Sequence, residues 1–141
     1  MQYHDMHHLE HRNIVNDLMK TLNGEFQAIC FYEYLANCAP NEVIRDRILE
    51  IRKDEMRHYA GFAYIYTCLT GMHPTPQLSD EPYPKTFQEG VHAAFIDEQQ
   101  AVEFYHQVAR ETQDCFISNA YMQASFDEQN HAVWFLYFMR G

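Results

Sequence analysis

Apolar side chains recur every three or four residues along four long stretches of the chain, and polar or proline-rich segments separate these stretches. This spacing is typical of amphipathic helices, and no stretch shows the sustained alternation of a β-strand. The pattern therefore predicts an all-α protein. We expect its helices at about Asn13–Asn37, from Asn41 to Leu69 or Thr70, from Thr86 onwards, and from Asp114 to Arg140.

Residues that favour helix ends stand at the boundaries of these stretches. Asn41 and Asp114 are good N-caps for the second and fourth helices. Thr86 followed by Glu89 is a capping-box pattern, which marks the start of the third helix. Residues 71–85 begin with a glycine and contain four prolines, so we expect a linker there.

Short turns join the first helix to the second and the third to the fourth, so each pair is expected to form an antiparallel hairpin. The linker of 15 residues can span up to about 50 Å when extended, which exceeds the length of a helix of about 40 Å. The chain thus predicts one domain, residues 1–141, folded as an up-down-down-up four-helix bundle. Its hairpins are expected at about 13–70 and 86–140, with the crossover at 71–85.

The second half of the chain repeats the first at a constant offset of 73 residues, without a gap. The segment EFQAICFYEYLA at 25–36 matches EQQAVEFYHQVA at 98–109. The segment DEMRHYAGFAY at 54–64 matches DEQNHAVWFLY at 127–137. Such a repeat predicts two hairpins that are related by a pseudo-twofold axis.

Several residues that recur in this repeat are polar, although their surroundings are apolar. The matched pairs are Glu25 with Glu98, Glu55 with Glu128, His58 with His131, Tyr32 with Tyr105, and Asp54 with Asp127. Solvated charges have little reason to recur while their neighbours change. The pattern therefore points to buried polar groups that share a role.

Helical spacing and charge together predict a metal centre. Glu55 and His58 are three residues apart and therefore share one helix face, and the matched pair in the second half does the same. A buried carboxylate costs several kcal/mol if it is left unpaired. Two divalent cations would cancel the charge of four carboxylates, and carboxylate with imidazole ligands suits iron, manganese or zinc. We predict two metal ions, with iron as the first choice, on Glu25, Glu55, His58, Glu98, Glu128 and His131.

Through Glu25, DEMRH at 54–58, Glu98 and DEQNH at 127–131, the chain resembles the rubrerythrin and erythrin branch of the ferritin-like superfamily. The resemblance covers nearly the whole chain. It implies a ferritin-like fold with a non-haem di-iron centre whose carboxylates bridge the irons. It also implies peroxide reduction, oxygen reduction or ferroxidation as the activity.

The cysteines bear on the source of electrons. Many rubrerythrins carry a rubredoxin domain that feeds electrons to the di-iron centre. None of the four cysteines here belongs to a Cys-x-x-Cys pair, so any reductant must come from a separate donor. Unpaired thiols of this kind are typical of a reduced, cytoplasmic protein.

Aromatic residues of the repeat fall into two groups. Tyr32 and Tyr105 stand seven residues after their glutamates, about two turns further along the same face. Each is expected to hydrogen-bond a ligand carboxylate or to serve as a radical site, and core packing is the alternative. Core packing is predicted for Phe62, Trp134, Phe135 and Tyr137.

Two aspartates of the repeat are predicted to support the histidines from outside. A ligating histidine usually donates its other ring N–H to a carboxylate or carbonyl. We predict that Asp54 supports His131, and that Asp127 supports His58 in the same way. Simple solvent exposure of both aspartates is the alternative.

The amino-acid composition excludes some classes of binding partner. Asp and Glu number 20 against 10 Lys and Arg, which argues against nucleic acid and anionic membranes. No apolar run approaches the length of a membrane span, and residues 1–13 are too polar for a signal peptide. We expect the protein to form a homodimer. We interpret the early histidines as a solvated helix start, with an accessory metal site as the alternative; they are His4, His7, His8 and His11.

Three functions are compatible with the sequence. The first is a di-iron oxidoreductase that reduces hydrogen peroxide or oxygen with electrons from an external donor. The second is a protein that binds or oxidises Fe(II) for storage or buffering. The third is a purely structural metal site, for example zinc, that stabilises the bundle.

Overall fold

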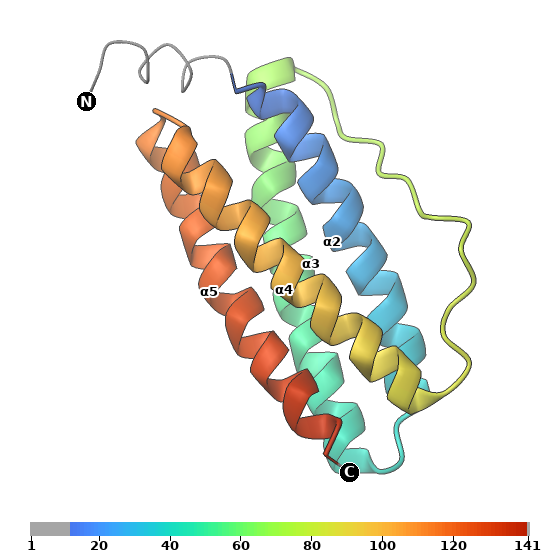
Figure 1. Ribbon diagram of the computed structural model, residues 1–141. Helices are drawn as coiled ribbons and strands as arrows, with labels where there is room; N and C mark the ends of the chain where they lie inside the picture. Colours follow the sequence, from blue (N-terminus) through green and yellow to red (C-terminus); the bar gives the residue numbers. More distant parts are fainter. Residues whose placement is uncertain (1–11, 141) are drawn as a thin grey trace.

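The computed structural model describes residues 12–140 of the 141-residue chain, which form four helices (Figure 1). These are α2 (Ile14–Asn37), α3 (Glu42–Thr70), α4 (Phe87–Glu111) and α5 (Cys115–Phe138). No strand occurs within residues 12–140, as the sequence pattern predicted. None of the described helices combines the length and the apolar character that a membrane span needs. The early histidines, His4, His7, His8 and His11, lie outside the described residues, so both interpretations of them stay predictions.

Each helix begins where a side chain accepts a hydrogen bond from one of its first backbone N–H groups. Asn13, Asn41, Thr86 and Asp114 each accept from the N–H three residues further on, at 3.0–3.1 Å. Such a cap stabilises a helix by about 1 kcal/mol. Gly71 ends α3 with a φ of 72°, in the left-handed region that glycine adopts without strain.

The last helix is shorter than predicted. It ends at Phe138 instead of Arg140. The backbone N–H of Met139 donates to the carbonyls of both Phe135 and Leu136, at 3.1 and 3.2 Å, so the final turn tightens. Arg140 therefore belongs to a turn beyond the helix.

The helices follow the predicted up-down-down-up order. α2 and α3 form one antiparallel hairpin, and α4 and α5 form the other (Figure 1). The crossover between α3 and α4 runs along the outside of the bundle from one end to the other, beside α2. The two hairpins meet through α3 against α5 and, more sparsely, through α2 against α4. The architecture is the four-helix bundle that the sequence predicted.

The core consists of two apolar clusters with a polar layer between them. One cluster includes Leu18, Leu22, Phe62, Tyr105 and Tyr121. The other includes Phe31, Leu35, Ile48, Val91 and Phe135. Along every helix, the predicted metal ligands lie between members of the two clusters. The clusters therefore separate the polar layer from both ends of the bundle.

The prediction of core aromatic residues is partly wrong. Phe62 and Phe135 are buried, and the half-buried Trp134 packs against the core cluster that includes Phe135. Tyr137, however, is 61% exposed. The error has a physical reason, because the last turns of α5, residues 132–138, are apolar at every position. A helix of that kind gives no sequence signal for the face that points outward.

Candidate metal centre

The predicted metal ligands come together in the polar layer at the middle of the bundle. α2 and α4 each contribute one glutamate, whereas α3 and α5 each contribute a glutamate and a histidine one turn further on. At most 7% of any of these side chains is exposed; they are Glu25, Glu55, His58, Glu98, Glu128 and His131. Buried carboxylates at this density need a compensating charge.

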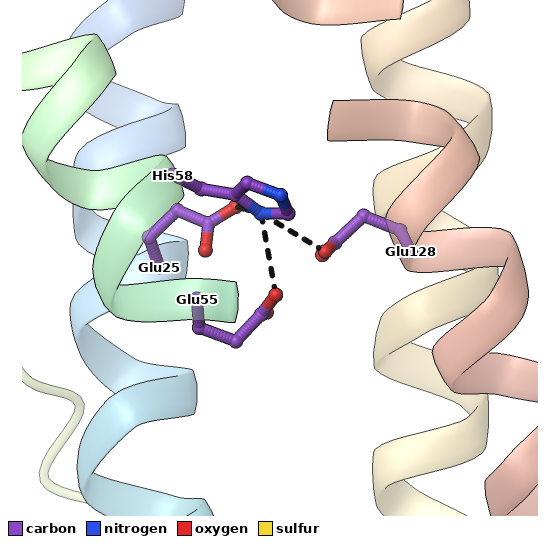
Figure 2. Close-up of side chains that lie close together, drawn as sticks. All are labelled: Glu25, Glu55, His58 and Glu128. Atoms are coloured by element: carbon purple, nitrogen blue, oxygen red, sulfur yellow. Dashed lines mark ion pairs between the residues drawn. The ribbon is translucent and has the colours of Figure 1, made fainter. Parts of the chain in front are cut away.

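The first group of ligand atoms surrounds the imidazole of His58, as Figure 2 shows. Its Nδ1 lies 3.3 Å from Oε1 of Glu55, on the same helix, and 3.3 Å from Oε1 of Glu128, on the opposite hairpin. Glu25 brings its Oε1 to 3.6 Å from the same nitrogen. One ligand atom from each of these four residues lies within 4.8 Å of the others, close enough for a single ion to reach them all.

The second group surrounds His131 in the same manner. Its Nδ1 lies 3.3 Å from Oε1 of Glu55 and 3.4 Å from Oε1 of Glu128. Oε1 of Glu98 is 3.5 Å away. Glu55 and Glu128 therefore belong to both groups of ligand atoms.

The hydrogen-bond pattern tests whether a metal fits. Each of the six residues has one buried nitrogen or oxygen atom that makes no well-oriented hydrogen bond within residues 12–140. Buried polar atoms are nearly always satisfied, so six unsatisfied atoms in one layer require an explanation. They are imidazole nitrogens and carboxylate oxygens, the donors that iron, manganese and zinc accept. The residues therefore fit a pair of metal ions.

Burial shifts the acidity of the glutamates. Burial raises the pKa of Glu25 from 4.5 to about 8, and the charge of Glu55 adds to the shift. The same two causes raise the pKa of Glu98 to about 7. Burial and then the charges of three neighbouring glutamates raise the pKa of Glu128 well above its ordinary value. In Glu55 burial acts in the same direction, but the adjacent imidazoles of His131 and His58 outweigh it and lower the pKa.

Burial and the neighbouring carboxylates shift the pKa of each histidine in opposite directions. Burial disfavours their charged form, yet the surrounding carboxylates, Glu128 foremost, raise the pKa of both His58 and His131 above 6.5. The metal-free cluster therefore retains protons on imidazoles and carboxylates. Metal ions must displace these protons in order to bind.

The predicted crossed contacts between aspartates and histidines are present. Nε2 of His58 lies 2.7 Å from Oδ2 of Asp127, and Nε2 of His131 lies 2.7 Å from Oδ2 of Asp54. Each bond links one hairpin to the other. Because Nε2 is engaged outward, Nδ1 faces the carboxylates and is the atom available to a metal.

Sequence reasoning missed Arg57, which joins the two aspartates. Its Nη2 lies 3.0 Å from Oδ1 of Asp54 and 3.4 Å from Oδ2 of Asp127. At the offset of 73 residues its counterpart is Asn130, so the repeat gave no signal for it. Arg57 therefore covers the α3–α5 side of the site in a way that the second half of the chain does not reproduce.

Both repeated tyrosines donate hydrogen bonds to glutamates of the cluster. The hydroxyl of Tyr32 donates to Oε1 of Glu98 at 2.6 Å, and that of Tyr105 donates to Oε1 of Glu25. Burial, together with the nearby carboxylates, raises the pKa of both tyrosines well above 10. They therefore stay neutral donors that hold the carboxylates of α2 and α4 in place.

A third buried tyrosine was not found from the sequence. Tyr121 packs edge-on against Tyr105, with ring centroids 5.3 Å apart, and its hydroxyl lies 2.7 Å from Oγ1 of Thr21. The residue at the matching position of the first half is Ile48, so the repeat again gave no signal. The contact between Thr21 and Tyr121 therefore has no counterpart at the matching positions, which are Ala94 and Ile48.

Comparisons with known proteins support the fold, and none of the matched proteins has a named function. The chain is 44% identical over 126 residues to the uncharacterised protein YhjR of Bacillus subtilis, an alignment that covers 89% of this chain and 86% of that one. A solved structure of a hypothetical protein from Pyrococcus furiosus matches with a TM-score of 0.78 at 17% identity, over 94% and 93% of the two chains. At that identity the match supports the fold alone. No family model matches the chain.

Proposed function

The chain belongs to the same family as YhjR of Bacillus subtilis, and we propose that it is a di-metal oxidoreductase that reduces hydrogen peroxide or oxygen. Iron is the proposed metal, and the ferritin-like di-iron proteins of the rubrerythrin and erythrin branch are the proposed functional relatives. The observation that carries the proposal is the convergence of six unsatisfied ligand atoms in one buried layer.

The proposal gives each residue of the cluster a role. Glu25 and His58 would hold one ion, and Glu98 and His131 would hold the other. Glu55 and Glu128 belong to both groups and would be shared. The pairing of a single glutamate with a Glu-x-x-His motif from a partner helix is the arrangement found in di-iron carboxylate bundles.

When bound, an iron pair supplies the redox change and the Lewis acidity that cleavage of an O–O bond requires. The residues of the chain contribute position and protection from solvent. Tyr32 and Tyr105 hold the glutamates of α2 and α4, while the aspartates orient the imidazoles. A separate redox protein or small reductant would supply the electrons.

A cavity beside the ligands separates this proposal from a structural metal site. In structural sites protein ligands fill every coordination position of the metal, whereas catalytic sites keep a position open for water or substrate. A cavity of about 710 Å³ reaches Glu25, Glu55, Glu98 and Glu128. A ligand set that faces a cavity of this size favours chemistry over a purely structural role.

Iron handling is the second candidate, and the net charge of −10 favours it, because an acidic protein attracts cations. Both candidate functions need the same metal ligands, so they must be distinguished by whether the protein consumes its substrate repeatedly. An oxidoreductase consumes peroxide repeatedly when a reductant is present. A storage or buffering protein oxidises Fe(II) and retains the product.

The test begins with metal analysis of protein from its native source, followed by rapid mixing of the Fe(II) form with hydrogen peroxide and with oxygen. We expect two ions per chain and sustained peroxide or oxygen consumption in the presence of a reductant. Glu103→Gln, an exposed change on α4, serves as the control for Glu98→Gln. Protein that binds no metal, or whose Fe(II) form reacts no faster than free Fe(II), would refute the proposal.

A further inference from the structure

The cavity beside the ligands has a definite location. It lies between α2 and α4, beneath the crossover segment, and its inner wall includes Glu25 and Glu98. Oε2 of each of these glutamates is buried and makes no hydrogen bond within residues 12–140. The cavity is therefore lined on its inner side by two glutamates, each of which has a buried carboxylate oxygen without a hydrogen bond in the described part of the chain.

Contacts at both ends of the α2–α4 pair keep the middle open. At one end, a Cβ atom on Gly90 would lie only 2.6 Å from Cδ1 of Leu35, so the missing side chain lets the helices approach. Towards the other end, Nζ of Lys20 lies 4.1 Å from the ring centre of Phe104. Between these contacts, a Cβ atom on Gly24 would meet no atom of the described residues within 4 Å.

The crossover forms the outer rim of the cavity and is fastened to α2. The backbone N–H of Gln77 donates to Oδ1 of Asn23 at 2.9 Å, and that of Ser79 donates to Oε1 of Gln27 at 3.1 Å. The ring of Tyr83 then packs on Phe31, with centroids 5.2 Å apart. These contacts hold the rim in place beside the cavity.

The opposite side of the site is closed. There Asp54 and Asp127 hydrogen-bond the two histidines from outside, and Arg57 lies across both aspartates. The apolar clusters occupy the two ends of the bundle. The α2–α3 and α4–α5 pairs pack closely against each other, so the cleft between α2 and α4 is the approach that remains for an ion.

Negatively charged side chains line the cavity both at the protein surface and at the buried ligands. Asp97 on α4 and Glu81 on the crossover are exposed residues that line the cavity, with Lys20 as the opposing charge. Asp97 has no equivalent in the first half, where Gly24 stands at the matching position. A cleft lined mostly by one sign of charge raises the local concentration of ions of the other sign.

We propose that the cleft between α2 and α4 is the path by which divalent cations reach the buried ligands, with Asp97 and Glu81 as its outer carboxylates and Gly24 as the residue that leaves it open. This inference rests on the proposed function, because it presupposes a metal centre. It adds residues that touch no metal and act only on the rate of loading.

A steric test uses Gly24→Leu, with Gly61→Leu as the matched control. Both glycines are exposed and helical, and a Cβ atom on either would meet no described atom within 4 Å, but Gly61 does not line the cavity. Metal-free protein is mixed with Co(II), and the visible absorption of bound Co(II) is followed. We expect Gly24→Leu to slow loading and release on the order of tenfold, while affinity and stoichiometry stay unchanged.

An electrostatic test uses Asp97→Asn with Glu81→Gln, compared with Asp46→Asn and Glu50→Gln on α3. The control pair removes the same charge from side chains that are 65% and 63% exposed and lie outside the cavity. We expect the cleft pair alone to slow loading, by roughly threefold to tenfold at low salt, with a smaller difference at high salt.

The outcomes separate the inference from the function on which it rests. Wild-type loading rates in both cleft variants, or equal slowing in the two controls, would overturn the path. A wild-type chain that binds no Co(II) at equilibrium would refute the metal centre itself. Slowed loading with unchanged final occupancy in the cleft variants supports both.

Discussion

Oδ2 of Asp127 lies 2.7 Å from Nε2 of His58, although the two residues belong to opposite hairpins. The same contact recurs between Asp54 and His131. The orientation of each imidazole therefore depends on the docking of the other hairpin. When the two hairpins dock correctly, the imidazoles are oriented by the same contacts.

Removal of both aspartates is expected to weaken metal binding without unfolding the helices. Loss of a carboxylate that orients a ligating histidine typically costs about 10–100-fold in metal affinity. We therefore expect a loss of this size for Asp54→Ala with Asp127→Ala, measured by competition with a chelator. Far-ultraviolet circular dichroism should stay unchanged. Asp46→Ala, at an exposed position, is the control, and unchanged affinity in the double variant would show that the crossed contacts do not support the metal.

Removal of the tyrosine hydroxyls tests a different contact. Tyr105→Phe and Tyr32→Phe each leave a buried carboxylate of the cluster without its donor. An unsatisfied buried acceptor costs about 1–3 kcal/mol, so each variant should unfold at lower urea concentration than the wild type when metal-free. Tyr137→Phe is the control because this side chain is 61% exposed. Equal midpoints in all the proteins would mean that the hydroxyls do not stabilise the carboxylates.

The features predicted correctly from the sequence are those that depend on local chemistry or on the repeat. Asn41 and Asp114 cap their helices because an N-cap depends on a few neighbouring residues. The convergence of the glutamates and histidines followed from the repeat, since residues that match at one offset in two similar hairpins meet near their symmetry axis.

The features that the sequence did not reveal depend on differences between the halves. Arg57 and Tyr121 stand where the other half has Asn130 and Ile48, so neither could be found by comparing the halves. The exposure of Tyr137 was mispredicted because the last turns of its helix, residues 132–138, are apolar at every position. The cavity depends on the separation of α2 and α4, a property of packing that no periodicity encodes.

Stability of the metal-free protein should fall as pH rises. The pKa values of Glu25 and Glu98 are about 8 and about 7 in the folded state, against 4.5 in the absence of burial. The folded state therefore keeps protons that the unfolded chain loses above 4.5, so the stabilisation is lost as pH rises through about 7 to 8. The raised pKa values of the histidines act in the same direction. The lowered pKa of Glu55 acts only below 4.5, outside this window.

Urea unfolding at about pH 6 and about pH 8 measures this effect. The midpoint of the metal-free protein should be lower at the higher pH. Metal-loaded protein should show the opposite trend, because metal binding displaces protons and strengthens as pH rises. Loading in weak buffer should accordingly release protons to solution. A metal-free midpoint that increases with pH would contradict the raised pKa values.

Glu55 and Glu128 differ from the other two glutamates because they belong to both groups of ligand atoms. Glu55→Gln or Glu128→Gln should therefore lower the occupancy of both positions, whereas Glu25→Gln or Glu98→Gln should leave about one tightly bound ion per chain. The amide keeps the volume of each side chain, so packing in the layer is preserved, while the negative charge is lost and one acceptor oxygen becomes an NH2 donor. Metal analysis after removal of free ions gives the stoichiometry directly. Equal losses in the shared and unshared positions would show that the six residues form one undivided site instead of two overlapping ones.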